Sequence, residues 1–328
     1  MTHFQETASL PLIALEEQYL NPEVISTQDS AQYSGLTPIC MSKLKTTGPS
    51  RLRDMRNGGI SMQVLSHVPV NLNPSTCRKA NDALYSAIVT NSGKFAAFAL
   101  LPLAEPKEAA NELIRCIQKY RFVGALINSH HHGEFLDKER FWPLFAAAEE
   151  FKVPLYIHPN FPAPSFAPHY RGDYAESIAI SLSTSDWGWH SETGLCILRL
   201  FAAGVFDRHP RIRLIIGQMG QMIPFMLDHI ISTIQNWPEK PRRSFKDVWL
   251  NNIWVTTSGM FSMAPMACLV NTMPPTRILF SVGYPFSGND MGKGFIEDLR
   301  VSGLVTQEEL EGIAFRNAER LLGLKAQK

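Results

Sequence analysis

Eight short apolar runs recur along the 328-residue chain, and they constrain its fold more than any other feature. Each run suits a strand that is buried on both faces, and longer amphipathic segments separate the runs. The expected strands are Leu12–Glu16, Ile60–His67, Phe95–Leu101, Val123–Asn128, Pro154–His158, Arg213–Gly217, Ile253–Thr257 and Arg277–Val282. The expected helices are Pro74–Thr90, Pro106–Lys119, Lys138–Phe151, Gly188–Phe206, Met222–Asn236, Ala264–Thr272, Lys293–Val301 and Gln307–Leu322. Strands joined through helices predict a parallel sheet, and eight such units predict an α/β fold of the (β/α)8 barrel (TIM barrel) type.

Length and composition favour a single domain over residues 1–328. Hydrophobic residues make up 45% of the chain, which is enough to bury a large core, and barrels of this size commonly form one domain. Segments 21–56 and 160–186 are longer than ordinary strand-to-helix connections and are rich in Ser, Pro and Gly. We expect these two segments to form a lid or the walls of a substrate site.

Charge and hydropathy exclude several classes of partner. The net charge is +1 and no basic block is present, so we expect no nucleic-acid partner. No run approaches the roughly 18 apolar residues that a membrane span requires, and the N-terminus lacks the pattern of a signal peptide, so we expect a cytoplasmic protein. The five cysteines are widely spaced and form no Cys-x-x-Cys pair, which predicts reduced thiols.

The barrel fold predicts where the chemistry lies. In (β/α)8 enzymes the reacting groups sit at the carboxyl ends of the strands. The expected strand ends carry Glu16, His67, Asn128, His158, Gln218, Thr257 and Gly283. We therefore expect Glu16, His158, Gln218 and Gly283 to meet in one cavity that takes a small-molecule substrate.

Several phrases of the chain resemble a known family. They are Ile13–Glu17, Gln63–His67, Tyr156–Pro159, Trp187–Leu195, Gly204–Arg208, Arg277–Ser281 and Asn317–Leu322. In this order they resemble the amidohydrolase superfamily, and more closely its non-oxidative aromatic acid decarboxylases, which act on dihydroxybenzoate, resorcylate or salicylate. The resemblance covers nearly the whole chain and implies the barrel fold, together with a homodimer or homotetramer.

The resemblance also implies a metal site, from which this chain departs. In that branch one divalent ion is held by a glutamate on the first strand, sometimes by the residue two positions later, by a histidine on the fifth strand and by an aspartate on the eighth. A histidine on the sixth strand acts beside the reacting carbon. Here Glu16 and His158 match, Gln18 is a weak ligand, Gly283 replaces the aspartate and Gln218 replaces the histidine. A catalytic zinc ion needs about three protein ligands, so we expect no metal and no other cofactor.

The substitutions favour a reused pocket over a decayed one, because the surrounding family-like phrases are intact. We therefore predict a metal-independent lyase or isomerase of secondary metabolism, which dehydrates, cyclises or decarboxylates a small aromatic or polyketide-like substrate. Glu16 and His158 would act as general acid and base. A metal-dependent aromatic acid decarboxylase and a non-catalytic binding protein or pseudoenzyme subunit are the alternatives.

The remaining site predictions concern residues near the expected strand ends. We place Gln218 and His190 with the catalytic residues, although a structural role for His190 is an equal alternative. The expected substrate-binding residues are His67, Asn128, Asn160, Trp187 and Tyr284. For His67 the alternative is a hydrogen bond to the backbone, and for Tyr284 it is aromatic packing.

Overall fold

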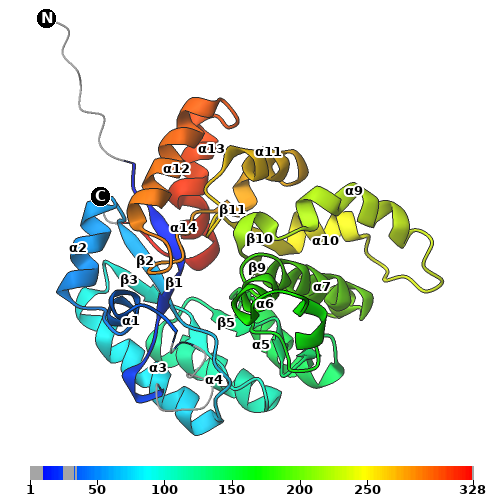
Figure 1. The fold of residues 1–328 in the computed structure, drawn as a ribbon, viewed down its shortest axis with the longest axis horizontal. Coiled ribbons are helices and arrows are strands. Elements are labelled where there is room, and N and C mark those ends of the chain that lie inside the picture. The colour runs from blue at the N-terminus through cyan, green and yellow to red at the C-terminus, as the bar shows by residue number, and fades with distance from the viewer. Residues whose placement is uncertain (1–9, 25–32, 34, 327–328) are drawn as a thin grey trace, which may run out of the picture.

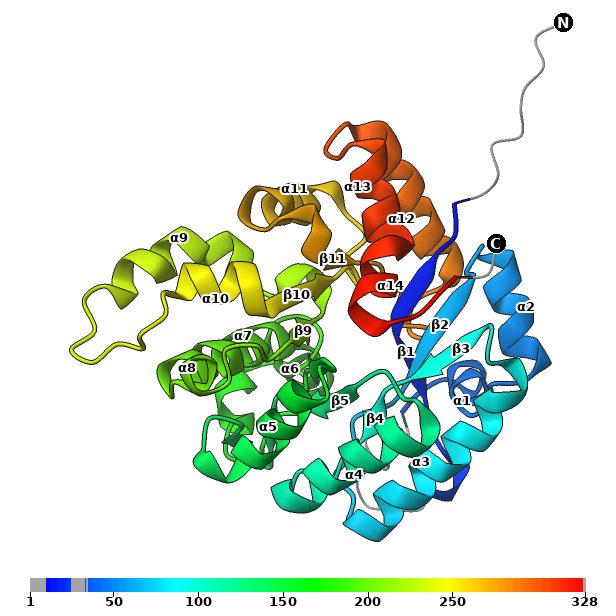
Figure 2. The same cartoon turned by 180° about the vertical axis from the view of Figure 1, so that it is seen from behind.

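The computed structural model describes residues 10–24, 33 and 35–326. Figure 1 shows helices arranged around central strands, with α9 and α10 reaching outward as a pair, and Figure 2 shows the same arrangement from behind. The strands are β1 Ile13–Tyr19, β2 Met62–His67, β3 Phe95–Ala97, β4 Ala99–Leu100, β5 Ala125–Asn128, β8 Leu155–His158, β9 Leu214–Ile216, β10 Ile253–Thr256 and β11 Ile278–Leu279. A short hairpin of β6 His130–His131 and β7 Glu134–Phe135 follows β5.

Helices cover the strands and also form parts of the connections. They are α1 Pro38–Leu44, α2 Pro49–Asn57, α3 Pro74–Ile88, α4 Pro106–Tyr120, α5 Trp142–Glu150, α6 Glu176–Ser183, α7 Gly188–Ala202, α8 Val205–Arg208, α9 Ile223–Ile234, α10 Phe245–Asn252, α11 Met263–Thr272, α12 Asn289–Ser302, α13 Gln307–Glu311 and α14 Asn317–Leu322. Two short helical turns are η5 Ala167–Tyr170 and η6 Gln218–Gly220, and Gln218 of η6 lines the cavity described below.

The parallel strands close into a barrel, which confirms the predicted fold class. Their order is β1-β2-β3 in one group and β11-β10-β9-β8-β5-β4 in the other. The strands β3 and β4 are one strand interrupted at Phe98, whose N–H bonds to Leu65 of β2 while the next N–H bonds to Gly124. At the other seam Leu15 of β1 pairs with Ser281 and donates its N–H to the Phe280 carbonyl at 3.1 Å.

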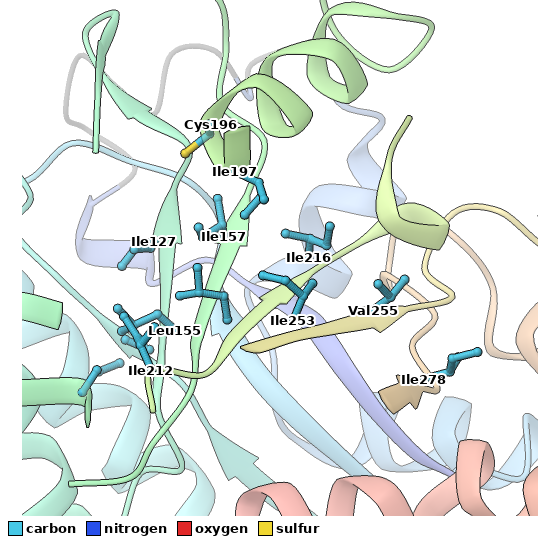
Figure 3. Close-up of a cluster of buried hydrophobic side chains, with 14 of the residues drawn as sticks. Ile127, Leu155, Ile157, Cys196, Ile197, Ile212, Ile216, Ile253, Val255 and Ile278 are labelled. Carbon is cyan, nitrogen blue, oxygen red and sulfur yellow. The ribbon is translucent and has the colours of Figure 1, made fainter. Parts of the chain in front are cut away.

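Alternating side chains of the strands belong to two of the three core clusters. Leu126, Tyr156 and Ile215 point into the barrel, where side chains from α14 join them. Their strand neighbours point outward against the helices, and Figure 3 shows Ile127, Ile157 and Ile216 from three adjacent strands near Ile197 of α7. Burial on both faces explains why these strands read as continuous apolar runs in the sequence.

The structure differs from the predicted elements mainly in the connections. Segment 21–56 contains α1 and α2, and segment 160–186 contains η5 and α6, none of which the sequence periodicity predicted. The expected helix Gly188–Phe206 is divided into α7 and α8 because Gly204 adopts the left-handed backbone with φ of 72°. The assignment of residues 1–328 to a single domain stays a prediction. The lid role of segments 21–56 and 160–186 also stays a prediction.

Asn81 joins the helical layer to the barrel. Its side chain on α3 donates to the Leu100 carbonyl and accepts the Leu100 N–H, both at 2.9 Å. We predict that Asn81→Leu lowers the free energy of unfolding by about 2–4 kcal/mol, because both backbone groups of Leu100 lose their partner in a buried place. Urea denaturation measures the effect. Asn111→Leu on the exposed face of α4 is the control and should change stability by less than about 0.5 kcal/mol. An equal effect of the two substitutions would contradict this role of Asn81.

Candidate functional site

A cavity of about 530 Å³ opens at the carboxyl ends of the strands. Polar side chains form part of its lining: Glu16, Gln18, His158, Gln218, Ser258 and His190. Apolar side chains form its walls, among them Leu36, Phe161, Trp189, Met260, Val282 and Phe286. The combination of apolar walls and a few converging polar groups is typical of a small-molecule site.

A bulge in β1 aims Glu16 into this cavity. Leu15 and Glu16 together stand opposite Val64 of β2, because the register shifts between Ala14 and Glu17. Glu16 has a φ of 62°, which is unusual for a residue with a side chain. Regular alternation after Leu15 would point this side chain away from the barrel interior, and the bulge turns it inward.

Glu16 is held by donors from neighbouring strands. Its Oε2 accepts hydrogen bonds from the Tyr156 hydroxyl and the Ser258 hydroxyl, and its Oε1 lies 3.1 Å from His158 Nε2. Burial raises the pKa of Tyr156 well above its ordinary value, and the charge of Glu16 raises it further. Tyr156 therefore remains a neutral phenol and a hydrogen-bond donor at physiological pH.

His158 presents its Nε2 atom to the cavity. The Nδ1 atom lies 2.6 Å from the Pro159 carbonyl, which can only accept, so Nδ1 carries the proton. The Nε2 atom then faces Glu16 Oε1 and the side-chain amide of Gln18, whose Nε2 is 3.4 Å away. The Oε1 atom of Gln18 is buried without a hydrogen-bond partner.

Glu17 points to the other side of β1 and holds the chain after β11. Its carboxylate accepts the backbone N–H groups of Val282, Gly283 and Tyr284 at 3.0 to 3.3 Å. Burial raises the pKa of Glu17 to about 7, although these hydrogen bonds and the charge of Arg51 lower it. Glu17 therefore positions the loop that contributes Val282 and Gly283 to the cavity wall.

Gln218 is the end of a chain of three side chains. Gln221 donates from Nε2 to Gln218 Oε1 at 2.5 Å, and its Oε1 lies 2.7 Å from His190 Nδ1. Gln218, Met219 and Gln221 all have positive φ, with values of 46°, 53° and 62°. This strained turn after β9 brings both glutamines toward the cavity side of the strand.

Gly283 lines the cavity but offers no side chain. Its φ is 77°, and a Cβ atom there would meet only the Ser258 Cβ, at 3.9 Å. A side chain at this position would therefore find space in the cavity, at the cost of a left-handed backbone.

The structure brings the four predicted catalytic residues to one cavity, since Glu16, His158, Gln218 and His190 all line it. Their catalytic roles stay predictions. The predicted substrate-binding residues are placed differently: His67, Asn128, Asn160, Trp187 and Tyr284 are not among the lining residues in the described part of the chain.

His67 and Tyr284 bond to other parts of the protein. His67 Nε2 accepts the Asn21 N–H at 3.1 Å, and its Nδ1 lies 2.8 Å from the Val68 carbonyl. The Tyr284 hydroxyl donates to Asp54 at 2.9 Å, and its ring lies against the Arg51 guanidinium.

Asn160, Trp187 and Asn128 also have places outside the lining. Asn160 braces the loop after β8 by donating to the His130 carbonyl at 3.1 Å. Trp187 precedes α7 and is 54% exposed, while Trp189 two residues later lines the cavity. Asn128 is buried at the end of β5.

Sequence reasoning missed Tyr156, Ser258 and Glu17 as residues of the site. Tyr156 lies in the middle of an apolar run and reads as a core residue; it is fully buried, and its hydroxyl contacts Glu16 and Thr256. Glu17 and Glu16 are adjacent, and the sequence gives no sign that a bulge separates their directions. Ser258 lies two residues beyond the end of β10, so the strand-end rule applied one residue after Thr257 would have found it.

A protein family and several known proteins are similar to this chain. A family model described as Amidohydrolase matches residues 49–324. The chain belongs to the amidohydrolase family. It is 41% identical to Decarboxylase orsB of Emericella nidulans over 326 residues, which are 97% of this chain and 98% of that protein. The predicted resemblance to the decarboxylase-like branch is confirmed.

Solved structures agree with this assignment. One is 2,6-dihydroxybenzoate decarboxylase in complex with 2,6-dihydroxybenzoate, which is 30% identical with a TM-score of 0.86 and covers 96% of this chain and 100% of that one. Another is dihydroxybenzoic acid decarboxylase from Polaromonas sp. with manganese and 2-nitroresorcinol, which is 29% identical with a TM-score of 0.86 and covers 96% and 98%. The prediction of a lyase-like enzyme is confirmed by these named decarboxylases.

The prediction that no cofactor is used is wrong. The Polaromonas structure holds manganese, which identifies a divalent metal as a cofactor of the family. The prediction counted strong ligands alone and gave Gln18 no weight as a donor. Among residues 10–24, 33 and 35–326 no group of three or more His, Cys, Asp or Glu side chains could hold a metal ion.

The residues of this chain nevertheless fit a divalent ion with an amide as the third ligand. Donors bound to one ion at about 2.1 Å lie roughly 3–3.4 Å apart. His158 Nε2 is 3.1 Å from Glu16 Oε1 and 3.4 Å from the terminal amide atom of Gln18. Rotation of that amide would turn the unpartnered Gln18 Oε1 toward His158, and carboxylate and carbonyl oxygens suit manganese.

No helix in the described residues is long and apolar enough to cross a bilayer. The cytoplasmic location, the lack of a nucleic-acid partner and the homodimer or homotetramer stay predictions.

His67 gives the protein a pH-dependent stability. Burial lowers the pKa of His67 to about 4. The unfolded chain therefore binds more protons than the folded one between about pH 6.5 and 4, so this contribution to stability is present above pH 6.5 and is lost as the pH falls. We predict that His67→Gln flattens the pH dependence of the free energy of unfolding over this window, measured by urea denaturation. An unchanged slope in His67→Gln would contradict the prediction.

The open position at Gly283 allows a test of the metal site. We predict that Gly283→Asp raises manganese affinity by about tenfold or more, because it adds a carboxylate to the donor set, and that Gln18→Leu lowers it. Titration calorimetry with manganese measures both. Gly303→Asp is the matched control, because Gly303 has a similar φ of 71° and open surroundings at the end of α12. Equal affinities in all four proteins would show that the ion does not bind at these residues.

Proposed function

We propose that the protein is a non-oxidative decarboxylase of a small hydroxylated aromatic acid. The observation that carries the proposal is the convergence of Glu16 and His158, 3.1 Å apart, at one cavity in a chain that is 41% identical to a decarboxylase. In the reaction the ring carbon that bears the carboxylate gains a proton. The bond to the carboxylate then breaks, its electron pair returns to the ring, and carbon dioxide leaves.

The cavity suits an aromatic ring. Its volume of about 530 Å³ lies within the range of small-molecule sites. Phe161 and Trp189 meet edge to face with ring centroids 5.7 Å apart on its wall, so a planar substrate finds aromatic surface there. The solved relatives hold 2,6-dihydroxybenzoate and 2-nitroresorcinol, which are rings of this size.

The polar groups of the described lining recognise substrate oxygens without a lysine or arginine side chain. None of the described lining residues is lysine or arginine. Gln218, Ser258 and Ser287 supply neutral hydrogen-bonding groups, and Glu16 and His158 supply the charged or titratable pair. A substrate with one carboxylate, whose negative charge a bound cation offsets, suits this lining better than a multiply charged anion.

A divalent ion at this cavity would be held by Glu16, His158 and Gln18, and it would polarise and anchor substrate oxygens as a Lewis acid. The chain itself fixes the donors in place. Tyr156 and Ser258 hold Oε2 of Glu16, and the Pro159 carbonyl holds Nδ1 of His158. Oε1 and Nε2 then face each other and can share either an ion or a proton.

The apolar wall has its own part in the reaction. Loss of carbon dioxide turns an anionic carboxylate into a neutral gas, and surroundings with few charges stabilise the ring product relative to the carboxylate. Met260, Val282 and Phe286 line the cavity and keep water from much of its surface.

We predict that the purified protein, supplied with manganese, releases carbon dioxide from 2,6-dihydroxybenzoate or from related dihydroxybenzoic acids. Glu16→Gln and His158→Ala should each lower turnover at least about tenfold. Product analysis by liquid chromatography measures this, and a chelator arm tests whether the ion takes part. His169→Ala, on an exposed residue, is the control. Binding of these acids without turnover, unaltered by Glu16→Gln, would favour a binding protein instead.

A further inference from the structure

His190, Gln221 and Gln218 form a continuous hydrogen-bonded path from helix α7 to the cavity. His190 Nε2 lies 2.9 Å from the Ser185 carbonyl, and His190 Nδ1 lies 2.7 Å from Gln221 Oε1. Gln221 Nε2 then donates to Gln218 Oε1 at 2.5 Å. Gln218 itself lines the cavity.

The direction of this path depends on one proton. The Ser185 carbonyl can only accept, so His190 Nε2 carries a proton in every state in which this bond exists. If Nδ1 is also protonated, it donates to Gln221 Oε1, Gln221 donates to Gln218 Oε1, and Gln218 turns its NH₂ group to the cavity. If Nδ1 carries no proton, it must accept a hydrogen bond from the NH₂ group of Gln221. The side-chain amides of Gln221 and Gln218 are then both turned over, and Gln218 presents its carbonyl oxygen to the cavity.

We propose that Gln221 transmits the protonation state of His190 to Gln218 and thereby sets whether the cavity offers a donor or an acceptor to the substrate. Gln221 is a positioning residue in this arrangement, since it acts on the ligand only through Gln218. In the structure an oxygen lies opposite each ring nitrogen of His190: Gln221 Oε1 at Nδ1 and the Ser185 carbonyl at Nε2.

Charged groups near His190 have other partners. Asp186, which precedes α7, accepts from the Ser181 hydroxyl, and Glu192 is bonded to His130 and Tyr170. Glu176 is the charged residue of α6, and it pairs with Arg171.

Across the cavity Glu16 faces His158. On α8, Asp207 accepts the backbone N–H groups of Arg242 and Arg243, and Arg208 lies over Trp142. Gln221 is the hydrogen-bond partner that links His190 Nδ1 to Gln218.

The path favours different ligands according to whether the ligand places a hydrogen-bond acceptor or a donor next to Gln218. A carboxylate or phenolate oxygen requires the NH₂ group and therefore favours doubly protonated His190. A hydroxyl that donates requires the carbonyl oxygen and favours the singly protonated ring. Binding of an anionic aromatic acid at Gln218 should thus take up a proton from solution.

Nitrogen NMR of full-length protein with ¹⁵N-labelled histidine tests the path without any ligand. Gln218→Glu replaces the amide by a carboxylate that only accepts, so it forces Gln221 to donate toward position 218. We expect the doubly protonated fraction of His190 at pH 7 to rise about threefold or more, and Gln221→Met in the same chain to cancel most of this rise. Such a double-mutant cycle separates the path from a direct effect of charge through space.

An equal rise with and without Gln221, or no rise at all, would overturn the proposal. Gln221→Ala provides a second interruption of the path if the Met variant does not fold, and thermal unfolding identifies folded variants.

A second arm adds 2,6-dihydroxybenzoate to the metal-free wild type and rests on the proposed function. Binding that increases the doubly protonated fraction supports the proposal, and binding without such an increase contradicts it. Failure of this acid to bind counts against the proposed substrate class, while the ligand-free cycle still decides the path.

Discussion

The closure of the barrel between β1 and the chain after β11 is the constraint on which the site depends. Leu15 pairs with Ser281 at this seam, and the N–H of Gln18 bonds to the Tyr284 carbonyl at 2.7 Å. The seam therefore carries Glu16 and Gln18 on one side and Gly283 on the other. The bulge in β1 lies in the seam as well, so the feature that closes the barrel also turns Glu16 into the cavity.

The cavity combines a fixed polar group with an apolar wall. Glu16 and His158 are positioned by neighbours from β8, from the loop after β10 and from the loop after β8, so they need little reorganisation to receive an ion or a substrate. The resemblance implies an aspartate at the position of Gly283, where this chain has no side chain, and the proposed ion would take the amide of Gln18 as its third donor. The family's metal and this chain's altered ligands are thus compatible.

Much of the fold could be predicted from the sequence because apolar runs and helical periodicity report burial directly. The strand-end rule located His158, which ends β8, and Gln218, which lies two residues beyond β9. It also located Glu16, although this residue lies inside β1, where the bulge turns it into the cavity. It did not work for Tyr284, because β11 ends at Leu279 and the irregular chain beyond it turns the ring toward Arg51. His67 ends β2 on the expected side of the barrel, but backbone groups of Asn21 and Val68 occupy its ring nitrogens. Such contacts come from distant loops, and no local pattern in the sequence encodes them.

Glu17 has a wider consequence for how this cavity can treat an anion. Consecutive backbone N–H groups often form a concave nest that binds carboxylates or phosphates. Here the N–H groups of Val282, Gly283 and Tyr284 are already taken by the protein's own carboxylate. The Glu17 carboxylate thus occupies the place that the carboxylate of a bound ligand could take. The recognition of an acidic substrate then depends on side chains of the cavity, and single substitutions can change it.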